Sequence, residues 1–159
     1  MTDPIKAGER YHAQKNVYKK FLDRVHIKKA IPALEELSAN AYARHDCLAC
    51  AACCKNYSPR FKAPDIKRIS KYLGLKESDM IAQYLHRDEE GDHVLNTKPC
   101  TFLNKDNTCS IYDVRPSDCS RFPYVDEDVF LKRKSLTLKN VSFCPIAQDA
   151  LEEMMKRML

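Results

Sequence analysis

Residues 47–54 of the chain are CLACAACC, a run with cysteines at positions 47, 50, 53 and 54. Two cysteines three residues apart can bring both sulfurs to about 2.3 Å from one metal ion, while neighbouring backbone N–H groups donate to the sulfurs. Three interlocked spacings of this kind are strong support for a metal site. Adjacent side chains point in different directions, so we expect Cys53 and Cys54 to have different roles.

Four more cysteines follow, each in a segment where proline or turn-forming residues make the chain turn tightly: Cys100, Cys109, Cys119 and Cys144. A plain reading is that some of them are buried apolar thiols, since free cysteine is among the most buried residues. The total of eight also permits two four-thiolate sites. A third reading is one four-iron four-sulfur cluster, with a separate metal ion or spare thiols.

Iron and zinc both remain open as the metal. Cys47, Cys50 and Cys53 have the spacing of the first three ligands of a bacterial ferredoxin, whose fourth cysteine precedes proline as Cys144 does. Here that fourth cysteine is remote in sequence, which keeps zinc as the alternative. His45 is a further candidate ligand, although eight thiols make it dispensable.

The composition indicates a folded chain with a small apolar core. Leu, Ile, Val and Phe total 35 of the 159 residues, about 22 per cent, just above the roughly 20 per cent below which chains tend to stay disordered. We therefore expect one structural domain in which bound metal replaces part of the missing core. Structural zinc contributes on the order of 10 to 16 kcal/mol in finger-like peptides, comparable with the net stability of a domain.

The formal net charge of +5 treats every cysteine as neutral. Eight thiolates on two divalent ions would lower it by four charges, so the basic balance does not require a nucleic-acid partner. The basic residues at 132–134 and 139 are expected on a solvated face. No apolar run is long enough to cross a bilayer or serve as a secretory signal. We expect a cytoplasmic protein without a membrane partner, whose cysteines stay reduced.

Apolar periodicity predicts helices over much of the chain. The first has a stripe at Tyr11, Gln14, Tyr18, Phe21, Leu22 and Val25. The second starts at Pro32, with a stripe at Ile31, Leu34, Leu37, Ala41 and Tyr42. Shorter helices are expected from Pro64 to the C-cap glycine Gly74, from Ser78 to His86, from Pro116 towards Arg121, and from Pro145 to the C-terminus.

Two short apolar pieces, Thr101–Leu103 and Cys109–Tyr112, flank the turn-forming residues 104–107 and predict a β-hairpin. Residues 88–92 are polar, include Gly91, and predict a turn. The fold class is therefore mainly α, with an irregular cysteine-rich metal-binding core and a short β-hairpin. Along the chain we expect an N-terminal helical segment at 1–45, a cysteine-cluster domain at 46–146 and a C-terminal helix at 147–159.

The cysteine run, the stretch 99–103 and the stretch 109–123, which contains Cys119, together resemble the YkgJ-type cysteine-cluster family. That family is described as a zinc- or iron-chelating domain and is similar to the metal-binding part of flagellin lysine N-methylases. The resemblance covers residues 46–146. It implies metal binding at eight positions: Cys47, Cys50, Cys53, Cys54, Cys100, Cys109, Cys119 and Cys144. One departure is Ser120, which stands where the family commonly has arginine, so that Arg121 comes one residue later.

Two functions are compatible with these features. The first is a metal-binding or iron-sulfur module with an accessory or redox-sensing role, for which a protein is a candidate partner. The alternative is a protein-modifying enzyme related to flagellin lysine N-methylase. The chain lacks a G-x-G-x-x-G fingerprint for a methyl-donor domain, which favours the first. Arg115 and Arg121, on either side of Cys119, are candidates to offset thiolate charge, or else to pair with Asp113 or Asp118.

Overall fold

The computed structural model describes residues 3–45 and 50–158. The chain divides into two compact units: unit 1 is formed by Met1–Ala52 together with Pro123–Leu159, and unit 2 by Cys53–Phe122. Unit 2 is thus one continuous segment, whereas unit 1 is assembled from both ends of the chain. The sequence predicts one structural domain made of three segments, 1–45, 46–146 and 147–159, and that division stays a prediction.

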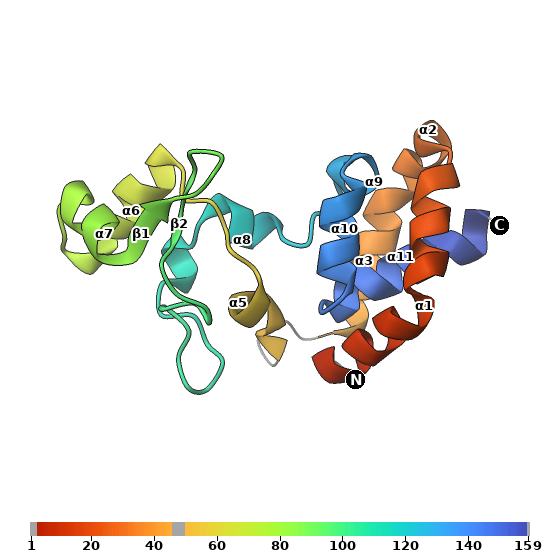
Figure 1. Cartoon of the computed structure of the whole chain (residues 1–159), viewed down its shortest axis with the longest axis horizontal. Coiled ribbons are helices and arrows are strands. Elements are labelled where there is room, and N and C mark those ends of the chain that lie inside the picture. Colours follow the sequence, from red (N-terminus) through yellow and green to blue (C-terminus); the bar gives the residue numbers. More distant parts are fainter. Residues whose placement is uncertain (1–2, 46–49, 159) are drawn as a thin grey trace. The chain divides into compact units, whose positions relative to one another are not determined.

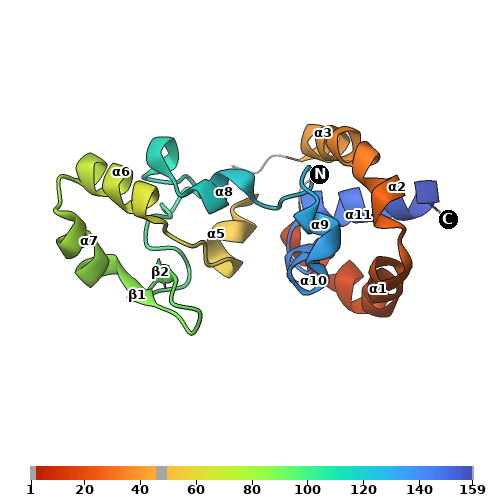
Figure 2. The same ribbon diagram turned by 90° about the horizontal axis from the view of Figure 1, so that it is seen from above.

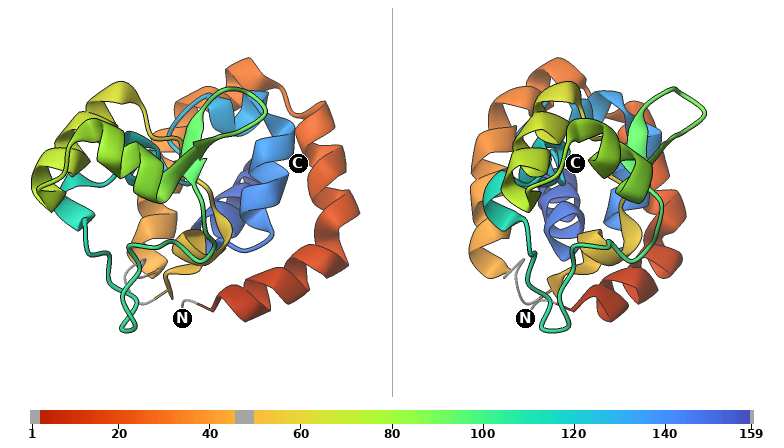
Figure 3. Two further views of the ribbon diagram at one scale, coloured as in Figure 1. Left: turned by 60° about the vertical axis from the view of Figure 1, so that its left-hand side comes forward. Right: turned by 90° about the vertical axis from the view of Figure 1, so that its left-hand side faces the viewer.

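Unit 1 is helical in its described part. Its elements are α1 (Pro4–Arg24), α2 (Ile27–Ala30), the 3-10 turn η1 (Ile31–Ala33), α3 (Leu34–Arg44), α9 (Val129–Lys132), α10 (Lys134–Val141) and α11 (Pro145–Met158). Helix α11 contacts α1, α3 and α10, and these helices lie around it in Figure 1 and Figure 3. The C-terminal helix is therefore the centre of this unit and not an appendage.

The buried residues of unit 1 follow the predicted helical stripes in part. Tyr18, Phe21 and Leu22 are buried in α1, and Leu34, Leu37 and Ala41 in α3. The prediction is wrong at the ends of the second stripe, since Ile31 and Tyr42 are exposed. The segment 129–141, which mixes β-branched and basic residues, forms α9 and α10, because Phe130, Leu131 and Val141 are fully buried there.

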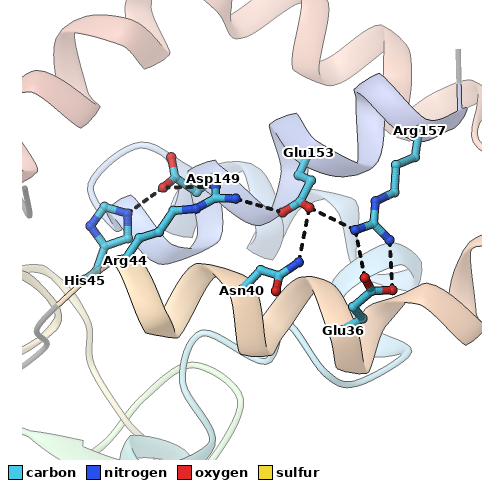
Figure 4. A network of polar contacts seen from close by, with 7 residues as sticks. All are labelled: Glu36, Asn40, Arg44, His45, Asp149, Glu153 and Arg157. Carbon is cyan, nitrogen blue, oxygen red and sulfur yellow. Dashed lines mark hydrogen bonds and ion pairs between the residues drawn. The ribbon is translucent and has the colours of Figure 1, made fainter.

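A polar seam joins α3 to α11, as Figure 4 shows. We use this name for seven residues: Glu36, Asn40, Arg44, His45, Asp149, Glu153 and Arg157. Glu153 accepts hydrogen bonds from Asn40 at 3.3 Å and from Arg157 at 2.9 Å, and Arg157 also binds Glu36. At the end of α3, His45 Nε2 lies 2.6 Å from the Asp149 carboxylate. The seam fixes how α3 and α11 are aligned along their length.

Unit 2 has shorter elements: α5 (Ala52–Asn56), α6 (Ala63–Leu73), α7 (Glu77–Tyr84), β1 (Leu85–Arg87), β2 (His93–Leu95), the 3-10 turn η2 (Tyr112–Val114) and α8 (Ser117–Arg121). Figure 2 shows α6 and α7 side by side with the hairpin β1–β2 following α7. The core of the unit is a cluster of eight buried side chains: Phe61, Ile66, Ile69, Met80, Leu85, Leu95, Phe102 and Ile111. Cys100 and Cys109 pack against this cluster.

The prediction of a mainly helical fold with a short β-hairpin is confirmed, but the hairpin lies elsewhere in the chain. Strands β1 and β2 pair antiparallel around the predicted turn at 88–92, where Gly91 has a φ of 81°. The segment expected to form the hairpin has one antiparallel bridge, between Leu103 and Cys109. Gly74 caps α6 as predicted, with a φ of 71°. Across the described ranges, 3–45 and 50–158, no helix is both long and apolar enough to span a membrane.

Candidate metal centre

Helix α5 carries the last two cysteines of the run, Cys53 and Cys54. Just before it, Ala51 has a φ of 48°, in the left-handed region that favours glycine, so the chain turns sharply inside the cysteine run. The Cys53 thiol donates a hydrogen bond to the Cys54 sulfur. This bond, helped by the charge of Lys55 and opposed by burial, lowers the pKa of Cys54 to about 7. Cys54 is therefore prepared to ionise at neutral pH.

The backbone connects Cys54 directly to Cys100. The Cys100 N–H donates to the Cys54 carbonyl oxygen at 2.7 Å. Cys100 then begins a tight turn, in which the Leu103 N–H donates to the Cys100 carbonyl at 3.1 Å. The N–H groups of Phe102 and Leu103 donate to the Cys100 sulfur. These two hydrogen bonds lower the pKa of Cys100 but do not cancel the effect of burial, which raises it to about 11.

Cys109 begins a second turn of the same kind. The Tyr112 N–H donates to the Cys109 carbonyl at 3.3 Å, and the Ile111 N–H donates to the Cys109 sulfur. The two turns are held together by the bridge between Leu103 and Cys109 and by the Ser110 N–H, which donates to the Phe102 carbonyl at 2.8 Å. The chain between 100 and 112 thus presents two cysteines in equivalent turns that are paired with each other.

Cys119 lies on α8, and two buried carboxylates hold this helix in place. Asp118, only 1% exposed, accepts three hydrogen bonds from Arg60: from its backbone N–H at 3.1 Å, from Nε at 2.9 Å and from Nη2 at 3.2 Å. Asp65, on α6, accepts from the Ser117 N–H at 3.1 Å and from Arg68 at 2.9 Å. Asp118 is the neighbour of Cys119 in the chain, and Asp65 binds the first backbone amide of α8, that of Ser117.

An aromatic contact brings the helices of Cys54 and Cys119 together. The rings of Tyr57, just after α5, and Phe122, just after α8, lie 4.6 Å apart between centroids. With the contacts between Arg60 and Asp118, this pair connects the segment that follows Cys54 to both sides of Cys119. Four separate segments of unit 2 therefore present their cysteines in one region.

The pKa values of Cys100, Cys109 and Cys119 are each raised in part by another of these thiols. Burial raises the pKa of Cys119 well above its ordinary value, and the charges of Cys100, Cys54 and Cys109 raise it further. Burial likewise raises the pKa of Cys100 to about 11, with contributions from Cys54 and Cys109. Charges at 54, 100, 109 and 119 therefore oppose one another, and a cation among them would relieve that opposition.

The side chains are not arranged as a finished coordination sphere. Among residues 3–45 and 50–158, no three histidine, cysteine or acidic side chains have the geometry to hold a metal ion. The chemistry of the donors nevertheless suits zinc or iron, since both metals take cysteine sulfur as a ligand, and the sulfurs of Cys100 and Cys109 receive backbone hydrogen bonds. Two cations add to this fit: Lys55 lowers the pKa of Cys54, and Arg115 opposes the rise at Cys109 caused by burial and by Cys54.

The four other predicted cysteines are Cys47, Cys50, Cys53 and Cys144, of which Cys53 lies beside Cys54 on α5. Cys47 is outside the described residues. Cys50 is half-buried in unit 1. Cys144 is buried in unit 1, where its N–H donates to the Asn140 carbonyl at 2.9 Å at the end of α10. The eight-cysteine ligand set therefore stays a prediction of the sequence.

His45, Arg115 and Asp118 have specific partners in the structure. His45 binds Asp149 in the polar seam of unit 1. Arg115 stacks on the Tyr112 ring, with its guanidinium carbon 4.0 Å from the ring centroid, and the partner of Asp118 is Arg60. The alternative in which Arg115 offsets thiolate charge is supported at Cys109. Sequence reasoning missed Arg60 and Asp65. Asp65 had a recognisable signal, since it is the third residue of α6, where a carboxylate can bind the N-cap amide of Lys62.

Comparison with known proteins gives one match. Residues 46–145 match the family CxxCxxCC, described as "Putative zinc- or iron-chelating domain". Because this match covers more than half of the chain, the chain belongs to that family. No curated protein and no solved structure matches the chain.

Proposed function

We propose that this protein binds zinc or iron through its cysteines and works as an accessory or redox-sensing module. The observation that carries the proposal is the convergence in unit 2 of four thiols from separate segments. Membership of a chelating family supports the same conclusion. Zinc bound there would supply structural cross-linking, whereas iron would also supply a redox couple.

The residues around the thiols would each have a defined part in binding. The four thiols release their protons when they become ligands, so binding is favoured as pH rises. The N–H groups of Phe102, Leu103 and Ile111 donate to sulfur and help to keep it ionised. Lys55 and Arg115 supply positive charge beside Cys54 and Cys109.

We favour an accessory module over an enzyme because four sulfur donors are enough to close a tetrahedral site. A relation to flagellin lysine N-methylases stays a prediction of the resemblance, as do a cytoplasmic location and a protein partner. A nucleic-acid partner is not needed to explain the basic residues near 132. Lys132 pairs with Asp128 at 2.6 Å and Lys134 with Asp23 at 3.5 Å, so much of that charge is neutralised within unit 1.

The test is elemental analysis and absorption spectroscopy of protein purified without oxygen. We expect at least one equivalent of zinc or iron per chain, with a colourless protein for zinc and a brown one for an iron-sulfur cluster. The control is the same protein stripped with a chelator under reducing conditions and then reloaded. Protein that neither carries nor takes up either metal would refute the proposal.

A redox-sensing role makes a further demand. Exposure of the loaded protein to hydrogen peroxide should release zinc, or change the spectrum of an iron site, and a thiol reductant with fresh metal should reverse the change. If the oxidant does not change the loaded site, the redox-sensing role is refuted and the accessory role stands.

A further inference from the structure

We propose that the solvent-facing side of α1, together with α2, is a binding surface for the phosphate backbone of double-stranded DNA. The surface, which we call the basic face, consists of six side chains: Lys15, Lys19, Lys20, Arg24, Lys28 and Lys29. All six are exposed. The proposal concerns unit 1 alone and does not rest on the binding of metal.

The positive charge of the chain is concentrated in this segment. Residues 15–29 contain six basic residues and one acidic residue, Asp23, so their net charge is +5 with histidine neutral. That value equals the formal net charge of the whole chain. Asp23 is paired with Lys134 of α10 at 3.5 Å, so a lysine from outside the segment balances its one negative charge.

The ion pairs of unit 1 do not neutralise the basic face. They are made by other basic side chains: Arg10, Arg44, His45, Lys132, Lys134 and Arg157. Across residues 3–45 and 50–158, no ion pair involves a side chain of the basic face. Unpaired charges of one sign, gathered on one helix, attract a partner of the opposite sign and speed its association.

Helix α1 lies at the edge of unit 1, as Figures 2 and 3 show, and its apolar side is buried there through Tyr18, Phe21 and Leu22. A helix that binds a membrane surface inserts its apolar side into the lipid, and in α1 that side is already used in the core. Its exposed large apolar residues, Ile5 and Val17, lie about 18 Å apart along the helix axis. The basic face is therefore suited to a dissolved polyanion and not to an anionic membrane.

The arrangement of the charges on α1 matches the major groove of DNA. Lys15 and Lys19 lie about one turn apart, and so do Lys20 and Arg24. At 3.6 residues per turn, the second pair lies about 140° around the helix from the first. A helix about 10 to 12 Å wide fits the B-DNA major groove, about 12 Å wide, with a phosphate strand on either side. Each basic pair can then contact one strand. Duplex RNA has a deep, narrow major groove, so DNA is the better match.

The experiment is fluorescence anisotropy of the full chain with a labelled DNA duplex of mixed sequence, about two helical turns long, at increasing salt. Four phosphate contacts predict a slope of about −3.6 for the logarithm of the binding constant against that of the salt concentration. The double variants K15Q/K19Q and K20Q/R24Q should each reduce the size of this slope by about 1.8 and weaken binding about tenfold or more near 50 mM salt.

The matched control is K67Q/K71Q, which removes two exposed lysines at the same spacing from α6 of unit 2. It should bind DNA like the wild type. All three variants should keep the wild-type melting temperature, since glutamine is nearly as good a helix former as lysine. They should also keep the wild-type metal content, so failure of this proposal and failure of the proposed function are separate outcomes.

A second measurement uses wild-type protein alone. Lysines are acetylated with and without the DNA duplex, and the peptides are analysed by mass spectrometry. DNA should protect Lys15, Lys19 and Lys20 and leave Lys67 and Lys71 reactive. The proposal is overturned if the wild type does not bind DNA near 50 mM salt, or if K67Q/K71Q weakens binding as much as the α1 variants. Tighter binding to duplex RNA, to polyglutamate or to phosphatidylglycerol vesicles than to DNA would overturn it as well.

Discussion

The buried carboxylate of Asp118 offers the most direct test of how α8 is held in place. In an Asp118→Asn variant the side chain keeps its size but loses its charge. It also turns an NH₂ group towards the Arg60 guanidinium, which has only donors to offer. We expect this variant to be less stable than the wild type and to hold Cys119 less firmly.

The size of the effect follows from the three bonds that Asp118 accepts. A hydrogen bond to a charged group contributes about 1.5 to 3 kcal/mol when its partners are buried. Here Asp118 is 1% exposed, but the Arg60 side chain is 42% exposed and regains water when released. We therefore expect a loss of about 2 kcal/mol in the free energy of unfolding. For a chain of this length that corresponds to a decrease of about 4 to 8 °C in melting temperature.

The assay is thermal and denaturant unfolding, with alkylation of Cys119 as a local measure. The control is Asp128→Asn, which removes the carboxylate from an exposed pair with Lys132, whose side chains are 53% and 57% exposed. Such a pair contributes little, so this variant should melt with the wild type. If Asp118→Asn also melts with the wild type and Cys119 reacts no faster, the proposed anchoring of α8 is wrong.

The same pair predicts a dependence on pH. Burial by itself would raise the pKa of Asp118, but the hydrogen bonds and charge of Arg60, with the charge of Lys62, lower it below its ordinary value. The stabilisation is therefore fully present above the unfolded-state pKa of about 4 and is lost as pH falls through the lower folded-state value. Asp118→Asn should show a smaller loss of stability in this acid range than the wild type.

Three further outcomes are expected. Gly74→Ala should cost about 1 kcal/mol through backbone strain, because Gly74 has a φ of 71°; a Cβ there meets nothing within 4 Å, so no clash contributes. Gly8→Ala inside α1 should be neutral or stabilising by up to about 1 kcal/mol, since alanine is the better helix former. Equal melting temperatures for the two variants would contradict this contrast. In metal-free protein near neutral pH, Cys54 should be alkylated well before Cys100, since their pKa values are about 7 and about 11, and mass spectrometry of the peptides would reveal the reverse order. Chelation should increase amide hydrogen exchange more in 100–121 than in α11, because the thiols of unit 2 would lose their cross-link; uniform change would argue against a local site.

Much of the helical architecture could be predicted from local sequence signals. Pro64 lies in the first turn of α6 and Gly74 caps its end, as expected. Apolar spacing identified Tyr18, Phe21 and Leu22 as buried in α1, although Gln14 of the same stripe is exposed. The hairpin was misplaced because residues 104–107 have strong turn chemistry but their flanks make only one bridge. The weaker signal at 88–92 lies between strands that the core of unit 2 pairs through Leu85 and Leu95.

The candidate site was only partly predictable, for a different physical reason. The eight cysteines are visible in the sequence because their spacing is local or their residue type is rare. Which of them meet depends on contacts far apart in the chain, such as those of Arg60 with Asp118 and of Asp65 with Ser117, each more than fifty residues apart. The spacing of apolar residues along the sequence gives no signal for an ion pair or hydrogen bond between residues so far apart. The backbone contact that joins Cys54 to Cys100 is likewise visible only in the structure.

The assembly of unit 1 from both ends of the chain has a consequence for synthesis on the ribosome. Unit 2 is continuous and is complete once Phe122 has emerged from the exit tunnel, whereas the centre of unit 1 awaits α11, which is made after unit 2. A nascent chain can thus fold the cysteine-bearing segment first, while α1 and α3 still lack their packing partner. Truncations that remove α11 should accordingly leave the first helices prone to aggregation or capture by chaperones, with unit 2 already formed.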